Sequence, residues 1–360
     1  MGRRMPLRGH WTGPDPQPKA VAIQAPPGPA PTPISAEIPM QPIDILMLKA
    51  MHPEVMDAVA RRFTLHRLDT APDPEAFLAE TGPRIRGLAT GAQAPVDRVL
   101  LARLPALEIV ASFGVGYDTI DTAAAAAQGV VVTNTPDVLT DEVADLALGL
   151  LLATVRQIPQ ADRHLRAGHW PRRTYPLTPT LRGRNVGILG LGRIGRAIAR
   201  RLEGFGVAIA YHGRRPQDDV PYAYHPTLIG LAEASDVLLV VAPGGPETNG
   251  IVDAAVLEAL GPQGLLVNVA RGSLVDETAL IRALQAGTIL GAGLDVFARE
   301  PHVPPELVAM DHVVLLPHVG SASVETRAAM GRLVVDNLVA WFDGRGPLTP
   351  VAETPWTAKA

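Results

Sequence analysis

Short apolar runs alternate along the chain with longer segments in which apolar residues recur every three or four positions. A run of roughly four to eight apolar residues predicts a strand buried on both faces, and the longer spacing predicts an amphipathic helix. The first run is 43–48, and a helix is expected near 53–63. Further strands are predicted at 64–68, 85–90, 109–113, 130–133, 186–189, 207–211, 237–241, 265–270, 289–296 and 313–316. Strands that alternate with helices predict an α/β fold built on parallel sheets.

A glycine-rich turn follows one of the predicted strands. Gly190, Gly192 and Gly195 form a G-x-G-x-x-G pattern. The first glycine of such a pattern permits a tight bend, the second admits a pyrophosphate, and the third lets a helix pack on the strand. Arg193 and Ile194 open the helix, whose free N–H groups favour an anion. A predicted strand precedes the turn and another follows the helix, which completes a βαβ unit. This context favours a dinucleotide site over a glycine-rich turn in some other α/β sheet.

The end of the next strand indicates which dinucleotide binds. NAD-binding versions place Asp or Glu about 20 residues beyond the turn, where the carboxylate binds the ribose 2′-hydroxyl and repels a 2′-phosphate. Here Gly213 stands 18 residues after Gly195, and Arg214 and Arg215 follow it. Guanidinium groups form charge-assisted hydrogen bonds with phosphate. The sequence therefore predicts NADP(H) in preference to NAD(H), with a solvated arginine pair as the alternative interpretation.

Two longer helical segments suggest how the chain is divided. One covers 141–167 and is broken near Pro159, and the other covers 321–342 with Met330, Leu333, Val334 and Leu338 on one face. We expect two doubly wound parallel-sheet domains. A Rossmann nucleotide-binding domain of about six strands (140–318) is inserted into a flavodoxin-like substrate-binding domain (42–139 and 319–346), and a tail (347–360) follows. Ligands of such sheets bind at the carboxyl ends of the strands, so a cleft between the domains is the expected site.

Composition narrows the class of protein. The 360 residues are 47% hydrophobic, which is enough for two cores, and a net charge of −4 gives no general basic field for nucleic acid. No apolar stretch is long enough to span a bilayer. The absence of cysteine excludes disulfides, thiol nucleophiles and Cys-ligated zinc. We expect a cytoplasmic protein that binds a small molecule and has no metal, nucleic acid or membrane as a partner.

The first 41 residues differ from the rest of the chain. They contain ten of the 35 prolines and show no sustained helical or strand period, so this head is expected to be disordered. Arg3 and Arg4 are similar to a twin-arginine signal, but no apolar h-region follows and we reject that interpretation. Met40, directly before the first predicted strand, is a candidate for the true start.

Titratable residues follow or end three of the later strands. Arg271 follows one strand, Asp295 and Glu300 lie at and just beyond the end of the next, and His318 follows the last. The carboxyl ends of parallel strands meet at one edge of a sheet. Taken singly, each residue could be an ordinary surface or structural group. Their shared position, after the glycine turn in the same predicted domain, favours a catalytic site.

The whole set of motifs resembles the D-isomer-specific 2-hydroxyacid dehydrogenase family over roughly 43–346, and it looks closest to the glyoxylate and hydroxypyruvate reductase branch. The matching segments are Gly-Val-Gly-Tyr-Asp at 114–118, the glycine turn, Asn-Val-Ala-Arg-Gly at 268–272, Gly-Leu-Asp-Val-Phe at 293–297, Glu300-Pro301 and Pro317-His318. In this family the nucleotide motif lies in mid-chain after a substrate domain, as it does here. The resemblance also implies a homodimer.

The resemblance implies that Arg271 orients the substrate, that His318 is the general acid and base, and that Glu300 partners the histidine. The physical chemistry agrees with these roles. A guanidinium fork can hold a planar 2-oxo acid, and histidine is the side chain whose intrinsic pKa lies nearest neutrality. A neighbouring carboxylate stabilises the imidazolium.

The resemblance extends to residues with less distinctive chemistry. It implies that the backbone N–H groups of Val115 and Gly116 bind the substrate carboxylate, although an ordinary strand-to-helix turn is the alternative. Asp295 resembles a residue that binds near the nicotinamide, and a structural aspartate is nearly as good an interpretation. Trp170 and Tyr175 are candidates to form the pocket wall of a partner subunit.

We therefore predict NADPH-dependent reduction of small 2-oxo acids, chiefly glyoxylate and hydroxypyruvate, to D-2-hydroxy acids. Two alternatives stay open. One is a reductase of a bulkier aromatic 2-oxo acid such as hydroxyphenylpyruvate, and the other is a non-enzymatic, nucleotide-sensing corepressor on the same fold. Formate dehydrogenases of the superfamily have Gln where Glu300 stands, which argues against that reaction.

Overall fold

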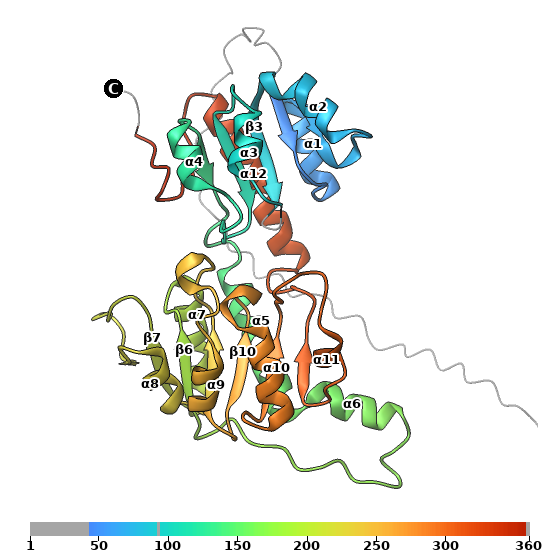
Figure 1. The fold of residues 1–360 in the computed structure, drawn as a ribbon, viewed down its shortest axis with the longest axis vertical. Coiled ribbons are helices and arrows are strands. Elements are labelled where there is room, and N and C mark those ends of the chain that lie inside the picture. Colours follow the sequence, from blue (N-terminus) through green and yellow to red (C-terminus); the bar gives the residue numbers. More distant parts are fainter. Residues whose placement is uncertain (1–42, 92–93, 358–360) are drawn as a thin grey trace, which may run out of the picture. The chain divides into compact units, whose positions relative to one another are not determined.

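The computed structural model describes residues 43–91 and 94–357, and it contains two parallel sheets of five and seven strands (Figure 1). This confirms the predicted α/β fold class. The Pro-rich head, with Met40, lies outside the described residues. None of the helices in the described ranges is both long and apolar enough to cross a membrane.

The five-stranded sheet is built from the first part of the chain. Its order, β2-β1-β3-β4-β5, is that of flavodoxin-like folds. The strands are β1 (Asp44–Met47), β2 (Thr64–Arg67), β3 (Ile85–Gly91), β4 (Ile109–Phe113) and β5 (Val131–Thr133). Every neighbouring pair is parallel, so helices must connect the strands across the faces of the sheet.

Helices bury both faces of this sheet because side chains alternate along each strand. On β1, Leu46 points into a cluster with α2, α3 and α4, whereas Ile45 and Met47 point into a cluster with α1 and α12. The helices are α1 (Pro53–Arg62), α2 (Pro74–Thr81), α3 (Arg98–Ala102), α4 (Thr122–Ala127) and α12 (Val324–Phe342). The end of the chain therefore returns to the first sheet.

The predicted apolar face of α12 is correct in part. Val334 and Leu338 pack on the first sheet, and Met330 packs in a core cluster of the second. Leu333 is only half-buried, and the polar Asn337 is fully buried in its stead. A hydrophobicity pattern does not identify Asn337 as a buried residue, because Asn337 is polar. Its burial is made possible by hydrogen bonds to the backbone and to Thr349.

The seven-stranded sheet has the order β12-β11-β10-β9-β6-β7-β8, which is the Rossmann order with one added strand. The strands are β6 (Asn185–Leu189), β7 (Ala208–His212), β8 (Ala223–Tyr224), β9 (Val237–Val240), β10 (Leu265–Asn268), β11 (Gly291–Leu294) and β12 (Val313–Leu315). The prediction of about six strands missed β8. This edge strand pairs with β7 and is only two residues long, which is too short for a strand pattern to be recognised in the sequence.

Helices also cover both faces of the second sheet. One core cluster joins the sheet to α8, α9 and α10, and the other joins it to α5 and α7. The helices are α5 (Thr140–Arg156), α6 (Ile158–Arg166), α7 (Arg193–Leu202), α8 (Leu228–Glu233), α9 (Ala254–Leu260), α10 (Glu277–Ala286) and α11 (Pro305–Val308). The predicted break near Pro159 is confirmed, because Gln157 adopts a left-handed conformation between α5 and α6.

Five short 3₁₀ helices complete the regular structure of the described ranges. They are η1 (Leu68–Thr70), η2 (Gly82–Arg84), η3 (Glu203–Phe205), η4 (Pro246–Thr248) and η5 (Gly272–Leu274). The last of these follows directly after Arg271, so it shapes the loop that carries this side chain.

The described part of the predicted tail (347–357) packs against the first sheet. Pro350 forms a bridge with Thr133 on β5, and the N–H of Val351 donates to the carbonyl of Val132. Val351 and Thr354 are both 4% exposed, so this segment contributes to the core.

Candidate active site

The glycine turn joins β6 to α7 with little space around two of its glycines. Gly190 has a φ of +99°, and a Cβ there would lie 2.7 Å from the backbone nitrogen of Ala242. A Cβ on Gly195 would lie 2.1 Å from the carbonyl oxygen of Gly190. The first glycine therefore permits the bend, and the third lets α7 approach the turn.

Gly192 is different because it faces open space. It is the N-cap of α7, no side chain caps the helix there, and a Cβ would meet no atom within 4 Å. The free N–H groups of the helix thus face a cradle that a pyrophosphate fits. Arg193, the first residue of α7, pairs with Asp137 at 3.0 Å, and the half-buried Ile194 packs against the core.

Gly213 comes directly after β7, as predicted. Its carbonyl accepts a hydrogen bond from the Tyr224 hydroxyl at 3.2 Å, and a Cβ would have no atom within 4 Å. Arg214 and Arg215 are exposed, and neither guanidinium forms a hydrogen bond or ion pair with another described residue. The nearby carboxylate of Asp219 is bound by Arg196 at 2.7 Å, which lowers the pKa of Asp219. Two cationic groups are therefore free to bind an anion.

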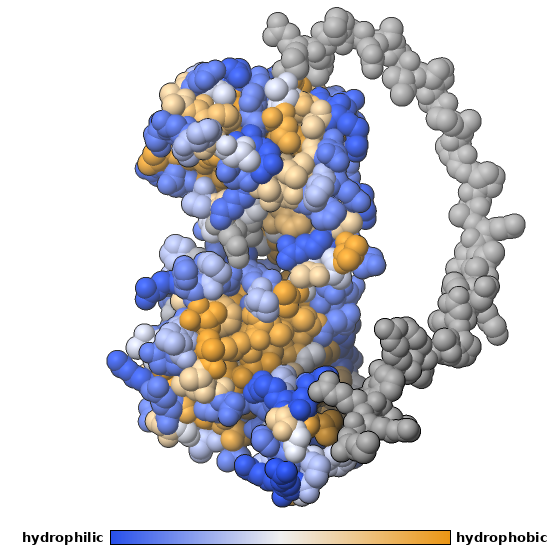
Figure 2. Space-filling view, turned by 90° about the vertical axis from the view of Figure 1, so that its right-hand side faces the viewer, coloured by the Kyte–Doolittle hydropathy of each residue, from blue (hydrophilic) through white to orange (hydrophobic). Residues whose placement is uncertain are grey.

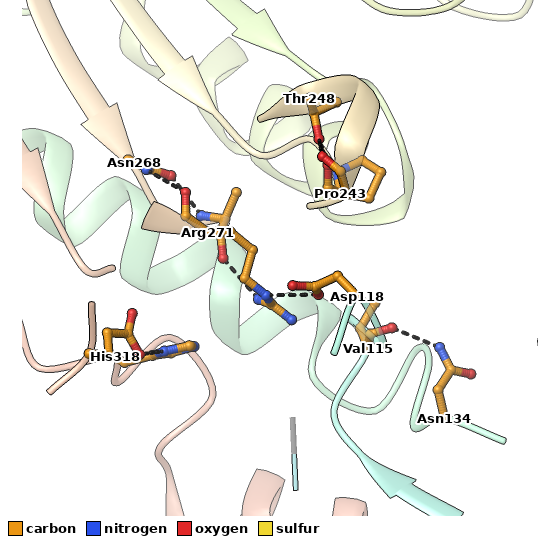
Figure 3. A network of polar contacts seen from close by, with 11 residues as sticks. Val115, Asp118, Asn134, Pro243, Thr248, Asn268, Arg271 and His318 are labelled. Atoms are coloured by element: carbon orange, nitrogen blue, oxygen red, sulfur yellow. Dashed lines mark hydrogen bonds and ion pairs between the residues drawn. The ribbon is translucent and has the colours of Figure 1, made fainter. Parts of the chain in front are cut away.

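Arg271 lies just beyond the end of β10, in a turn shaped by Asn268. The Asn268 amide accepts from the N–H of Ala270 at 3.0 Å and donates to the carbonyl of Arg271 at 2.9 Å. The Arg271 side chain reaches toward the loop after β4, where its Nε donates to Asp118 at 3.1 Å (Figure 3). Its Nη1 donates to the carbonyl of Ala270 at 2.9 Å.

The loop after β4 is built to fit against this guanidinium. A Cβ on Gly116 would lie 1.8 Å from Nη2 of Arg271, so only glycine allows the approach. Nη2 forms no hydrogen bond to a residue in the described ranges, and it adjoins the backbone of the segment predicted to bind the substrate. The carbonyl of Val115 accepts a hydrogen bond from Asn134 at 2.9 Å.

His318 and Glu300 come together, as predicted. Nδ1 of His318 lies 2.7 Å from Oε2 of Glu300. An ionised carboxylate only accepts hydrogen bonds, so Nδ1 carries the hydrogen and Nε2 is left for a ligand. The other carboxylate oxygen of Glu300 accepts from the N–H of Phe297 at 3.0 Å, which fixes the carboxylate from within its own loop.

Asp295 follows β11 and holds the loop that carries His318. It is 1% exposed, and its carboxylate accepts from the N–H groups of Val319 and Gly320, each at 2.8 Å. Burial raises the pKa of Asp295, and these two N–H groups oppose that shift. The carbonyl of Asp295 also accepts from the N–H of His318 at 2.8 Å. The histidine is thereby held at a φ of 54°, in the left-handed region.

Arg271, Asp295 and His318 therefore follow three adjacent parallel strands, β10, β11 and β12. Their common edge is the carboxyl edge, where α/β sheets bind ligands. The loops after β10 and β11 also touch, because a Cβ on Gly272 would lie 1.9 Å from the carbonyl carbon of Phe297. The three predicted groups thus share one site with a common scaffold.

Comparison with known proteins agrees with this geometry. Residues 148–320 match the model of the NAD-binding domain of D-isomer-specific 2-hydroxyacid dehydrogenases. A glyoxylate/hydroxypyruvate reductase of Arabidopsis thaliana is 48% identical over 312 residues, which cover 87% of this chain and 100% of that protein. The chain belongs to this family. The predicted family is thereby confirmed, and the protein is a dehydrogenase with an NAD(P)-binding domain.

Two further relatives of this dehydrogenase are informative. A hydroxyphenylpyruvate reductase of Plectranthus scutellarioides is 47% identical over 312 residues, covering 87% of this chain and 100% of that protein. The crystal structure of an NADPH-dependent glyoxylate/hydroxypyruvate reductase from Sinorhizobium meliloti, with NADP and malonate, is 52% identical. It superposes with a TM-score of 0.83 over 89% of this chain and 100% of that one.

Sequence reasoning missed several groups around the site. Asp118, which binds Arg271, lies in a motif that was recognised without a role for the aspartate. Asn134 directly follows β5, and its position at a strand end was the signal that could have found it. Glu277, at the start of α10, accepts from the N–H of Ala298 at 3.2 Å and braces the loop of Glu300.

Two other predictions concern residues outside this cluster. Trp170 lies in the segment after α6 and is 61% exposed, whereas Tyr175 donates from its hydroxyl to Gln157 at 2.9 Å. Their role in a partner subunit stays a prediction.

In the parts of the chain that the structure describes, no group of three His, Asp or Glu side chains could hold a metal ion.

The glycine turn yields a test that separates folding from cofactor binding. We expect Gly195→Ala to lower the melting temperature by several degrees, because its Cβ meets backbone and overpacking costs about 1–3 kcal/mol. Gly192→Ala should leave the melting temperature of the cofactor-free protein unchanged and weaken binding of NADPH, since its Cβ occupies only the cradle. Thermal unfolding and fluorescence titration with NADPH measure the two effects. Equal affinity in Gly192→Ala and wild type would contradict the assigned cradle.

Proposed function

We propose that this dehydrogenase uses NADPH to reduce small 2-oxo acids, chiefly glyoxylate and hydroxypyruvate, to D-2-hydroxy acids. The observation that carries the proposal is the placement of Arg271 and the His318–Glu300 pair at the ends of adjacent strands in the sheet that bears the glycine turn. The names of the Arabidopsis and Sinorhizobium relatives support the choice of substrates.

Each side chain has a distinct part in this reaction. Arg271 binds the substrate carboxylate and the adjacent carbonyl oxygen, with Nη2 available and Nε fixed by Asp118. NADPH, when bound, would supply the hydride for the carbonyl carbon. Negative charge then grows on the carbonyl oxygen, and Nε2 of His318 donates a proton to it. Glu300 stabilises the imidazolium form that precedes this transfer.

Asp295 acts on this chemistry through the backbone. Its buried carboxylate holds the two peptide N–H groups that follow His318, so it fixes the direction of the imidazole. We propose Asp295 as a positioning residue beside the nicotinamide site.

Arg214 and Arg215 are proposed to bind the 2′-phosphate of NADPH. Both guanidinium groups are exposed at the end of β7, where NAD-specific enzymes have a carboxylate. Gly213 offers no negative charge to repel the phosphate. The NADPH dependence of the Sinorhizobium relative supports this assignment.

A bulkier aromatic 2-oxo acid is the second candidate substrate. The Plectranthus relative, 47% identical to this chain, is a hydroxyphenylpyruvate reductase. The chain is nearly equally identical to a relative named for small substrates and to one named for an aromatic substrate. The shared motifs therefore indicate the type of reaction but not the side chain of the substrate.

We further propose that the enzyme is a homodimer. The face shown in Figure 2 carries a broad hydrophobic area. Apolar side chains of α6 and the segment after it are also exposed, including Ile158 at 53%, Leu165 at 55% and Trp170 at 61%. Single exposed apolar residues are ordinary, but a contiguous apolar area typically marks an interface. Light scattering at assay concentrations should give twice the mass of one chain.

The substrate assignment is tested with a panel of 2-oxo acids. We expect glyoxylate and hydroxypyruvate to give the highest kcat/KM with NADPH, followed by loss of its absorbance, and hydroxyphenylpyruvate to give a lower value. A higher kcat/KM with hydroxyphenylpyruvate would favour the aromatic candidate. Binding of NADPH without turnover of any 2-oxo acid would overturn the enzymatic proposal.

The role of His318 is tested by substitution. His318→Ala should lower kcat by about 10² to 10⁴-fold, the range of general acid catalysis, and leave NADPH affinity nearly intact. His52→Ala is the matched control, because His52 is exposed and its side chain caps no helix. If His318→Ala kept the kcat of the wild type, another group would have to donate the proton.

Cofactor preference is tested by exchanging charge at the end of β7. The wild type should show a higher kcat/KM with NADPH than with NADH. Gly213→Asp combined with Arg214→Ala should move preference toward NADH by roughly ten- to a hundredfold, since it removes attraction and adds repulsion. Arg282→Ala, an exposed arginine on α10, is the control and should change neither value. Preference of the wild type for NADH would refute the assignment.

A further inference from the structure

The peptide group between Val115 and Gly116 is held from one side by Asn134. The Asn134 side-chain amide donates to the carbonyl of Val115 at 2.9 Å, and Figure 3 shows this contact on the side of Val115 away from Asp118 and Arg271. Asn134 directly follows β5 and is half-buried, so its side chain is supported by the sheet.

A peptide group is planar and trans, so its C=O and N–H point in opposite directions. The carbonyl of Val115 and the N–H of Gly116 belong to the same peptide. A hydrogen bond that fixes this carbonyl toward Asn134 therefore fixes the N–H of Gly116 away from it. Gly116 is also the residue whose backbone adjoins Nη2 of Arg271.

We propose that Asn134 is a positioning residue, which aims the N–H of Gly116 at the substrate carboxylate without touching the substrate. The proposal rests on the proposed function, in which the Val115–Gly116 segment and Arg271 bind a 2-oxo acid. Without this bond the peptide can rotate, and the N–H loses its direction before the substrate arrives. The loss should appear in the KM for the 2-oxo acid.

The C-terminal segment holds Asn134 in turn. The backbone N–H of Asn134 donates to the carbonyl of Thr349 at 3.3 Å, and the Thr349 hydroxyl donates to the carbonyl of Asn134 at 2.6 Å. Thr349 is itself held by Asn337 of α12, whose amide donates to the Thr349 hydroxyl at 3.0 Å and accepts from its N–H at 3.1 Å. Asn337 is 0% exposed, so this relay is anchored in the core.

A second bond ties the same loop to the same segment. The Tyr117 hydroxyl donates to the carboxylate of Glu353 at 3.0 Å. The loop is closed at its start by Gly114, whose N–H donates to the Thr135 hydroxyl at 3.0 Å. The C-terminal segment from Thr349 to Glu353 is therefore part of the support of the substrate site.

The test replaces the donor of Asn134 with an acceptor of the same size. Asn134→Asp should raise the KM for glyoxylate by about ten- to a hundredfold, because the carboxylate repels the Val115 carbonyl. The KM for NADPH should stay within about twofold of the wild type, since the glycine turn lies on another loop. This difference between the two KM values is an effect that general loss of stability would not produce.

Gln128→Glu is the matched control. Gln128 follows α4, and its amide donates to the carbonyl of Leu104 at 2.8 Å, so the substitution makes the same chemical change at a backbone carbonyl outside the substrate loop. Both KM values should stay at those of the wild type. A rise in the KM for glyoxylate equal to that of Asn134→Asp would overturn the proposal, because it would show a general effect on the domain.

Thr349 provides a second variant that does not alter the loop itself. Thr349→Val removes the hydroxyl at nearly constant size and should raise the KM for glyoxylate about three- to tenfold. Thr349→Ser retains the hydroxyl, so its KM for glyoxylate should equal that of the wild type. If Asn134→Asp does not fold, this pair decides. An unchanged KM in Thr349→Val, or no recovery in Thr349→Ser, would contradict the relay.

The outcomes also separate this proposal from the proposed function. A wild type that reduces no 2-oxo acid overturns the function, and with it the need to position a substrate carboxylate. A wild type that reduces glyoxylate, with an Asn134→Asp variant of the same KM, overturns only the role of Asn134.

Discussion

Burial of both sheet faces is the constraint from which the site follows. Side chains from β6, β9 and β10 alternate between two core clusters, so the strand interiors have no place for a charged group. Polar side chains can stand only where the strands end. Because the strands are parallel, their carboxyl ends meet at one edge, and Arg271, Asp295 and His318 are gathered there. The chemistry is therefore placed by the hydrophobic pattern.

The groups at this edge depend on one another. His318 has a left-handed backbone, which costs roughly 1–2 kcal/mol for a residue with a Cβ. The hydrogen bonds from His318, Val319 and Gly320 to Asp295 offset this cost. Asp295 is buried, which raises its pKa, and the same N–H groups compensate for the loss of water. His318 and the buried Asp295 thus stabilise each other.

Whether a feature of this structure could be predicted from the sequence depends on the interactions that stabilise it. The two sheets and the glycine turn could be predicted, because buried strands and a phosphate cradle impose regular spacings. The His318–Glu300 pair was implied by the resemblance to the family and not by any spacing. The edge strand β8 could not, because a two-residue strand at a sheet edge needs no apolar run. Asn134 and Asn337 were missed for another reason. Their side-chain amides bond backbone groups up to 19 residues away in the chain. The position of Asn134 after a strand could mark it as a candidate, but no local pattern records the bond itself.

The two anion sites proposed for this dehydrogenase differ in a way that matches the ligands proposed for them. Arg214 and Arg215 are exposed and unpaired in the described ranges, whereas Arg271 is held by Asp118 and by its own turn. A dinucleotide makes many contacts, so it can supply the free energy needed to order two surface side chains. A 2-oxo acid such as glyoxylate has few atoms and can supply little. The site for such a small acid must therefore be ordered before the acid binds. The binding energy is then not used to order side chains and can stabilise the transition state. In the proposed substrate site, Asp118, Gly116 and Asn134 would provide that order.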